Sequence, residues 1–590
     1  MACLSLGSHW ADVLILDPAL ATIPEELTVC QNRNMVPSGA QKLAEDRSIG
    51  AMVLSAAELY GEIEAVVDLS SESAPIRLSY IDLAEQVQRC ARAAIGAGLS
   101  PGGRAAIWAP NLYEWIVAAL GVLSAGGVLV PVNTRFKGSE ARYLLDRSKA
   151  ELLFTVRGFL GIDYPEMLKN AYGQEESSVK TTIILREFAG HEDGDSGTDS
   201  VKDGSSIEQI IGWDEFLRLG ESVSSKASTD RARSVGRDDL GDIIFTSGTT
   251  GNPKGVMTTQ GQTLTVFREW GKTVGVQSGD RYLVVNPFFH TFGYKAGIIA
   301  SLMHGATLIP MVSLDVDALL GIVEQEKITV LPGPPTLYST ILDHPDRSKY
   351  DLSSLRLAVT GAAVVPVELI RRMRSELQFE TVLTAYGLTE STGTATMCRQ
   401  GDDPETIANT SGRAIPGTEV KVVNPDGIEV DPGIAGEVIV KGYNVMLGYL
   451  DDPVQSKEAI DQDGWLHTGD IGTMDKSGNL KITDRKKDMF IVGGFNAYPA
   501  EIENIMMGYP AISQVAVIGV PDERMGEVGC AFVVPRPGMV VDERECLDWC
   551  KEQMANYKVP RRVIVSGSLP LNASGKVLKG ELRQMISRKS

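Results

Sequence analysis

The sequence has few of the features that mark secreted, nucleic-acid-binding or metal-binding proteins. Its seven cysteines are odd in number and scattered, and none shows the paired spacing of a zinc site, so a reduced, cytoplasmic setting fits best. The N-terminus has no basic region of the kind that begins a signal peptide. Positive charge is also scarce: the formal net charge is −20, which argues against nucleic acid or an anionic membrane surface as a main partner.

A long uninterrupted apolar run is also absent. The most apolar stretch, Trp115 to Val132, is interrupted by Ser124, Gly126, Gly127 and Pro131. This pattern predicts a buried helix followed by a buried strand rather than a membrane span. We therefore expect no integral membrane association, and we expect a monomer or homodimer that acts on small molecules.

The sequence does contain enough apolar residues for several globular domains. Of its 590 residues, 43% are hydrophobic and 22% are charged. From Leu78 onward, helix and strand patterns alternate, which indicates a layered α/β architecture. Residues 190–206 are acidic and rich in glycine and serine, which predicts a disordered surface insertion. Residues 1–52 are expected to form an extension of unknown role without a usable motif, and Met35 and Met52 are candidates for an alternative start.

The most informative stretch runs from Asp242 to Gly255. Residues 243–245 predict a buried strand, which leads into hydroxyl residues, glycines and Lys254. Backbone N–H groups, hydroxyls and a lysine together can surround phosphate oxygens, although an ordinary polar turn is the alternative. The stretch is not the usual P-loop, because Gly255 follows the lysine. The residues expected to contact phosphate are Thr246, Ser247, Gly248, Thr249, Thr250, Gly251 and Lys254.

Polar or glycine residues also follow other predicted strands. One strand is expected to end at Gly361 and another at Tyr386, and ligands of α/β sheets bind beyond the carboxyl ends of strands. We therefore expect the ends at Thr246, Gly361 and Tyr386 to line one crevice. A further strand is predicted to end at Pro287 and to place His290 in a loop, where a pocket role and a packed core role are both open.

The string from Thr246 to Gly255, together with later motifs in order, resembles the signature of the adenylate-forming enzymes, which include acyl-CoA synthetases, peptide-synthetase adenylation domains and luciferases. The resemblance covers about Leu78 to Leu582. It implies an α/β fold with a large N-terminal domain of layered sheets and a β-rich subdomain, residues 53–486. It also implies a small mobile α+β C-terminal domain, residues 487–590, with the hinge at Lys487.

The same resemblance implies the cofactors and the site. ATP, Mg²⁺ and coenzyme A would be used, and the acid would be activated as an acyl-adenylate. Lys576, Lys254 and Glu390 match the catalytic residues, and Glu390 with Thr246 would bind the metal. Outside this family context, Glu390 would be a surface acid and Lys576 a solubility residue. The other matching nucleotide- and thiol-side residues are Gly361, Ala362, Ala363, Ala385, Tyr386, Gly387, Leu388, Thr389, Asp470, Arg485, Gly493 and Gly494.

Three segments look more narrowly like the bacterial CoA ligases of steroid-ring degradation. They are residues 286–297, 328–335 and 383–390. This resemblance implies a steroid-derived bicyclic propanoate as the acid. The bulky rings of residues 288–294 would obstruct a fatty-acid tunnel, and His290, Tyr294 and Lys295 would offer donors to ring ketones. The alternatives are that the rings pack in the core and that Lys295 faces solvent. The predicted substrate residues are His290, Phe292, Gly293 and Gly387.

Two other functions remain open from the sequence. A medium- or long-chain fatty acyl-CoA synthetase would carry the same ATP motifs. A nucleotide-binding regulatory protein on this fold, without catalysis, would belong to a different class. The acceptor could also be a carrier-protein phosphopantetheine arm, although free coenzyme A is the expectation. Pyrophosphate release from ATP and a carboxylic acid would separate the enzyme from the regulatory protein.

Overall fold

The computed structural model describes most of the chain after residue 38. The described ranges are 39–71, 74–188, 209–246, 253–361, 365–485, 488–492, 495–497, 499–522, 524–554, 556–571 and 577–587. The insertion predicted at 190–206 lies outside them.

The largest sheet has nine strands, and the two that flank the predicted phosphate segment in the sequence, β9 and β10, lie near one edge of it. Strands β9 to β8 of this sheet run parallel, whereas β10 and β19 are antiparallel to their neighbours. The spatial order is β19 (Gly448–Tyr449), β10 (Lys254–Thr259), β9 (Leu240–Thr246), β4 (Val128–Pro131), β3 (Arg104–Trp108), β5 (Leu152–Phe159), β7 (Thr181–Glu187) and β8 (Gln209–Gly212), with β6 (Ile162–Asp163) paired to β5.

A second sheet consists of two four-stranded parts joined through Val330, which bridges to Tyr282 and to Leu357. Because β13 and β14 are parallel, with Gly361 opposite Ala385, their carboxyl ends lie side by side. The first part contains β11 (Arg281–Val284), β12 (Thr307–Pro310), β1 (Glu64–Asp68) and β2 (Ile76–Ser79), and the second contains β13 (Leu357–Gly361), β14 (Thr381–Tyr386), β15 (Thr396–Met397) and β16 (Arg413–Ala414).

Two further sheets follow in the sequence. The third is antiparallel, with the order β17 (Thr418–Val423), β18 (Gly436–Gly442), β20 (Leu466–Met474) and β21 (Leu480–Arg485). The fourth has the order β23 (Phe495–Ala497), β22 (Phe490–Val492), β25 (Gly526–Pro535) and β24 (Ile512–Asp522), with β26 (Arg562–Val565) paired to β25. Two apolar clusters between Phe490 and Ile586 belong to this last sheet. The boundary at Lys487 lies outside the described residues and stays a prediction.

Helices pack against these sheets, and their ends follow local capping rules. Ser79 and Thr259 each cap a helix through a reciprocal contact with the residue three positions on. The helices up to residue 304 are α1 (Gly39–Ala44), α2 (Ile49–Tyr60), α3 (Tyr80–Gly96), α4 (Tyr113–Ser124), α5 (Gly138–Ser148), α6 (Tyr164–Tyr172), α7 (Trp213–Leu219), α8 (Ser225–Ser234), α9 (Gln260–Val274), the π-helix η4 (Phe292–Ile299) and α10 (Ala300–His304). The later helices are α11 (Val316–Glu326), α12 (Pro335–Leu342), α13 (Val367–Glu376), η6 (Thr389–Ser391), α14 (Pro404–Asn409), α15 (Pro453–Ala459), α16 (Pro499–Met506), α17 (Glu543–Gln553) and α18 (Lys579–Ser587).

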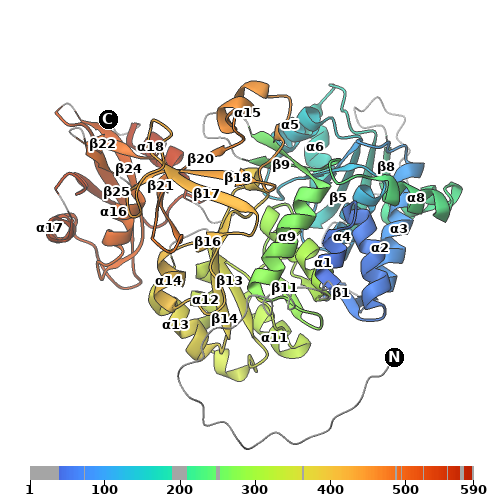
Figure 1. The fold of residues 1–590 in the computed structure, drawn as a ribbon, viewed down its shortest axis with the longest axis horizontal. Coiled ribbons are helices and arrows are strands. Elements are labelled where there is room, and N and C mark those ends of the chain that lie inside the picture. Colours follow the sequence, from blue (N-terminus) through green and yellow to red (C-terminus); the bar gives the residue numbers. More distant parts are fainter. Residues whose placement is uncertain are drawn as a thin grey trace, which may run out of the picture. The chain divides into compact units, whose positions relative to one another are not determined.

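The start of the fold differs from the expectation of a separate extension up to residue 52. Helix α2 spans that boundary and packs against α3 and α4, as Figure 1 shows. Leu43, Ile49 and Met52 are fully buried in the main apolar core. Ser48 caps α2 by accepting from the Ala51 N–H at 3.1 Å. Residues 39–52 are therefore part of the packed structure, because their apolar side chains lie in the main core.

The apolar stretch from Trp115 forms a buried helix and then a strand, as predicted. Every residue of α4 from Glu114 to Ser124 is buried, and β4 follows at Val128. Of the helices in the described ranges, none is both long enough and apolar enough to cross a bilayer.

Candidate active site

The two strands that flank the phosphate segment place Thr246 and Lys254 opposite each other. The two residues are Cα partners in the ladder between β9 and β10. On the other side of β10, Val256 pairs with Tyr449 of β19. This pairing brings the Lys254 ammonium to 4.9 Å from the centre of the Tyr449 ring, and the ammonium also donates to the side-chain oxygen of Gln455. The lysine is therefore fixed by an aromatic face and an amide.

Tyr449 also joins Lys254 to the predicted metal-binding acid. Its hydroxyl donates to Glu390 Oε1 at 3.0 Å. Burial and then the neighbouring Glu390 carboxylate raise the pKa of Tyr449, so the phenol stays protonated and remains a donor. Lys254 and Glu390, which are far apart in the sequence, thus contact the same side chain.

A second pair of predicted residues meets at the end of β14. The Tyr386 hydroxyl donates to Asp470 Oδ2 at 2.7 Å, and Asp470 is only 3% exposed. Asp470 lies on β20, where its Cα partner on β21 is Arg485. For Arg485 the structure describes the backbone position only. The strand pairing therefore brings together the acid and the arginine that were predicted to contact the ribose and the phosphate side.

The chain after Tyr386 turns so tightly that only glycine fits at the next position. A Cβ atom on Gly387 would lie 2.3 Å from the carbonyl oxygen of Gly393. The turn is closed by the Ser391 hydroxyl, which accepts from the Leu388 N–H at 2.9 Å. This turn leads directly into η6, which begins at Thr389 and carries Glu390. The predicted segment therefore has a defined conformation.

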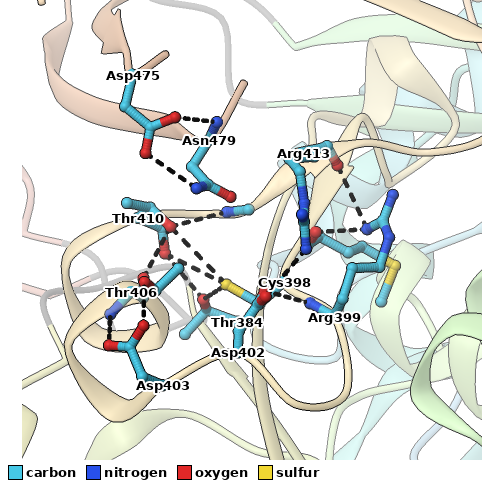
Figure 2. Close-up of polar contacts among 12 residues, drawn as sticks. Thr384, Cys398, Arg399, Asp402, Asp403, Thr406, Thr410, Arg413, Asp475 and Asn479 are labelled. Atoms are coloured by element: carbon cyan, nitrogen blue, oxygen red, sulfur yellow. Dashed lines mark hydrogen bonds and ion pairs between the residues drawn. The ribbon is translucent and has the colours of Figure 1, made fainter. Parts of the chain in front are cut away.

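A polar network connects β14 to the segment that follows β15 (Figure 2). The Thr384 hydroxyl of β14 lies 2.9 Å from the carbonyl oxygens of both Ile407 and Thr410. The segment that follows bonds to the start of β21, since the Leu480 N–H donates to the Gly412 carbonyl at 2.8 Å. Figure 2 also shows the Asp402 carboxylate, which accepts from Arg413 Nη2 at 2.9 Å and from the backbone N–H of Arg399 at 2.7 Å. The strand of Tyr386 and the hairpin of Asp470 are thus held by one shared segment.

The predicted substrate region begins after β11, which ends at Val284 rather than at Pro287. The strand ends early because the Asn111 side chain makes the hydrogen bonds that a neighbouring strand would otherwise make with the backbone after Val284. Its amide donates to the Val284 and Asn286 carbonyls at 3.3 and 3.0 Å, and its oxygen accepts from the Phe288 N–H at 2.8 Å. The chain therefore leaves the sheet early and turns toward η4.

Of the predicted substrate residues, His290 and Phe292 are accessible and Gly293 is packed. His290 is exposed. Its Nδ1 accepts from the Phe292 N–H at 3.2 Å, so the neutral ring carries its proton on Nε2 and can donate there. A Cβ on Gly293 would lie 2.1 Å from the Pro287 carbonyl oxygen, so this position requires glycine.

Three other side chains of this region do not have the expected role. Phe288 and Tyr294 are fully buried and pack against Trp115, with ring centres 5.1 and 5.9 Å apart. Lys295 is also fully buried, and its ammonium lies 3.0 Å from Asp242 Oδ2. Phe288 and Tyr294 thus belong to the apolar core, and the Lys295 ammonium is engaged by a carboxylate rather than offered to a ring ketone.

The remaining predicted site residues lie outside the described part of the chain, and their roles stay predictions. Sequence reasoning missed Tyr449 and Gln455, for which no motif gave a signal. It also missed the pairing of Asp242 with Lys295, although each is a charge within an otherwise apolar run. The undescribed site residues are Ser247, Gly248, Thr249, Thr250, Gly251, Ala362, Ala363, Lys487, Gly493, Gly494 and Lys576.

Comparison with known proteins agrees with this arrangement. The family model described as "AMP-binding enzyme" matches residues 54–450, and that of the "AMP-binding enzyme C-terminal domain" matches residues 501–576. The chain belongs to the AMP-binding enzyme family. This confirms the predicted α/β fold class, in which a large N-terminal domain is followed by a small C-terminal domain.

Two relatives and one solved structure illustrate the similarity of this AMP-binding enzyme. A 3-[(3aS,4S,7aS)-7a-methyl-1,5-dioxo-octahydro-1H-inden-4-yl]propanoyl:CoA ligase of Rhodococcus jostii is 48% identical, covering 90% of this chain and 97% of the relative. The ligase of that name in Mycobacterium tuberculosis is 47% identical, covering 86% and 94%. The o-succinylbenzoate CoA synthetase of Bacillus subtilis with its acyl-adenylate has a TM-score of 0.73 at 26% identity, covering 91% and 98%.

Proposed function

We propose that this AMP-binding enzyme is an ATP-dependent carboxylate–CoA ligase for a steroid-derived bicyclic propanoate. It is an acyl-CoA synthetase that joins an acid to coenzyme A through an acyl-adenylate. The similarity to two CoA ligases for the same bicyclic acid, over nearly their full lengths, carries the choice of acid. The grouping of Lys254, Tyr449 and Glu390 supports the ATP chemistry.

The reaction requires an enzyme that neutralises negative charge. A carboxylate is a poor acyl donor, because oxide would have to leave. Attack of the carboxylate on the α-phosphate of ATP forms an acyl-adenylate and releases pyrophosphate, and the thiol of coenzyme A then displaces AMP. The first step brings two anions together, so positive charge and hydrogen-bond donors at the phosphates lower its barrier.

The described residues fit the nucleotide half of this reaction. Lys254 would contact the phosphates together with Thr246 and the segment between them. Asp470 has two carboxylate oxygens that suit two neighbouring ribose hydroxyls, and Tyr386 already donates to one of those oxygens. The Tyr386 hydroxyl therefore orients the acid before the ribose binds.

Glu390 and Thr246 would hold a magnesium ion in a site completed by phosphate oxygens. Among the residues that the structure describes, no group of three or more His, Cys, Asp and Glu side chains could hold a metal alone. Mg²⁺ commonly binds through one or two protein oxygens and substrate phosphates, and it would neutralise phosphate charge here. Tyr449 donates to one Glu390 oxygen and so keeps the carboxylate in a fixed orientation.

The C-terminal residues complete the proposal. Lys576 would bridge the carboxylate and the α-phosphate during adenylation, and Gly493 and Gly494 would line the path of the thiol. Lys576 would obstruct the thiol in the second step, so rotation about Lys487 between the two half-reactions is physically sensible. The donor for a ring ketone would be His290 Nε2, which is the proton-bearing nitrogen of the neutral ring.

A comparison of acids tests the proposal. The purified enzyme is given ATP, Mg²⁺ and either the bicyclic propanoate or straight-chain acids of eight to sixteen carbons. Pyrophosphate release without coenzyme A and thioester formation with it are measured for each acid. We expect kcat/KM to be at least about tenfold higher for the bicyclic acid.

Two outcomes would contradict this assignment in different ways. A preference of about tenfold for palmitate would make the protein a fatty acyl-CoA synthetase. Nucleotide binding without pyrophosphate release, for any acid, would instead favour the non-catalytic regulatory protein.

A further inference from the structure

A charged side-chain network is buried between β9, β10 and η4. Asp242 and Thr258 face each other across the two strands, and the Thr258 hydroxyl donates to Asp242 Oδ1 at 2.7 Å. The Lys295 ammonium donates to the same hydroxyl at 2.7 Å and lies 3.0 Å from Asp242 Oδ2. The lysine and aspartate side chains are 0% and 1% exposed. The three residues form a closed ring of polar contacts without access to water.

This network joins the two halves of the proposed reaction site. Asp242 lies on the strand that ends at Thr246, and Thr258 lies on the strand that begins at Lys254. Lys295 lies in the π-helix η4, which begins with Phe292 and Gly293. The network therefore attaches the acyl-side helix directly to the strand pair that carries the phosphate-side residues.

The attachment matters because η4 is a π-helix, whose wider turns can relax toward an α-helix. A π-helix adds a residue to each turn, is rare, and is frequently found at functional sites. One residue of register corresponds to about 100° of rotation in an α-helix. Relaxation of η4 toward the α-helical register would turn Phe292 relative to Lys295. The ion pair opposes this rotation, because the Lys295 ammonium contacts Asp242 in the π-helical geometry and would be moved away from it.

The pair is also costly to bury, which argues for a role beyond stability. The desolvation free energy of a buried ion pair is larger than that of a surface pair. Replacement of a buried pair by apolar residues is often neutral or stabilising. The ladder between β9 and β10 does not need Lys295, because backbone hydrogen bonds hold those strands. The element that gains orientation from the network is therefore η4.

We propose that Lys295 is a positioning residue that determines acid specificity by holding η4 in its π-helical register against Asp242 and Thr258. The proposal rests on the proposed ligase function. Lys295 does not touch the substrate itself. It acts through Phe292 and His290, whose placement relative to Thr246 sets which acid can reach the α-phosphate. A displacement of about 1 Å at such residues is enough to change rates by about two orders of magnitude.

The test separates positioning from folding. The single variant Lys295→Met leaves the Asp242 carboxylate buried without its cation, and we expect a marked loss of thermal stability. The triple variant Asp242→Val, Thr258→Val, Lys295→Met removes every polar group of the network, and we expect most of the stability to return. Lys272→Met, at an exposed lysine of α9, is the matched control and should behave like the unmodified enzyme.

The decisive measurement is acid selectivity in the folded triple variant. We expect the ratio of kcat/KM for the bicyclic propanoate to that for octanoate to fall about tenfold, and the KM for ATP to stay within about twofold. An unchanged ratio, or an equal loss for both acids, would overturn the positioning role. A triple variant that fails to fold would also overturn it, because the network would then serve folding alone. If the unmodified enzyme forms no acyl-adenylate, the proposed function itself fails, whatever the variants do.

Discussion

Tyr449 contacts both Lys254 and Glu390, and its hydroxyl can be tested separately from its ring. Tyr449→Phe keeps the aromatic face beside Lys254 and removes the donor to Glu390. A hydrogen bond to a charged group contributes about 1.5–3 kcal/mol, so we expect kcat/KM for pyrophosphate release to fall by about tenfold or more. Tyr443→Phe, which removes a bond to the Pro416 carbonyl, is the matched control. Equal rates in both variants would show that Glu390 needs no partner.

Lys576 allows the two half-reactions to be separated at the residue scale. Lys576→Ala should lower acyl-adenylate formation by about two to four orders of magnitude, because a charge at the α-phosphate is removed. The same variant should still convert supplied acyl-adenylate and coenzyme A to thioester. Equal failure of both steps in a folded variant would contradict the assigned role.

Residues of the site differ in how far the sequence alone predicts them. Asp470 and Glu390 belong to short contiguous sequence motifs, which can be recognised without a structure. Tyr449 acquires its role from strand pairing with β10, and the sequence does not state that pairing. The sequence suggests Lys295 as a substrate contact, because its partner Asp242 lies on a distant strand. Contacts between distant segments are therefore what sequence reasoning missed.

Helix α2 provides a test at the scale of elements. A chain that starts at Met52 would lack Leu43 and Ile49, which are fully buried, and the cap from Ser48. Each buried side chain contributes about 1.5–3 kcal/mol and the cap about 1 kcal/mol, so the free energy of unfolding should fall by several kcal/mol. Thermal unfolding of chains that start at Met52 and at Met35 measures this difference. Equal stability would show that residues 35–51 are dispensable.

The proposed hinge is an element-scale prediction as well. Lys487→Pro fixes φ near −65° at the proposed pivot and restricts rotation. We expect pyrophosphate release to be retained and thioester formation to slow by about tenfold or more. Separate measurement of the two half-reactions checks this, and normal thioester turnover would remove the hinge from this position.

Helices and strands with strong local patterns were predicted well. The helix from Tyr80 and the strand before Thr246 follow apolar periodicity and capping signals. The end of β11 was not predicted, because the side chain of Asn111 from another element replaces the ladder partners there. The π-helical turn of η4 has no sequence rule of comparable strength.

At the scale of the whole molecule, ligand binding should be visible as stability. A ligand at about one hundred times its Kd adds about 2.7 kcal/mol to the folded state. We therefore expect a non-hydrolysable ATP analogue with Mg²⁺ to raise the Tm by at least about 1 °C, and Asp470→Ala to reduce the rise. Differential scanning fluorimetry checks this. No shift at saturating nucleotide would contradict the nucleotide site.

The buried pair of Asp242 and Lys295 also has a consequence for inheritance. Loss of either charge alone leaves the other buried and unpaired, so single substitutions at these positions pass through a destabilised protein. The two codons should consequently be replaced together or remain as they are. The pair therefore limits which substitutions can accumulate at positions 242 and 295, whichever acid the enzyme uses.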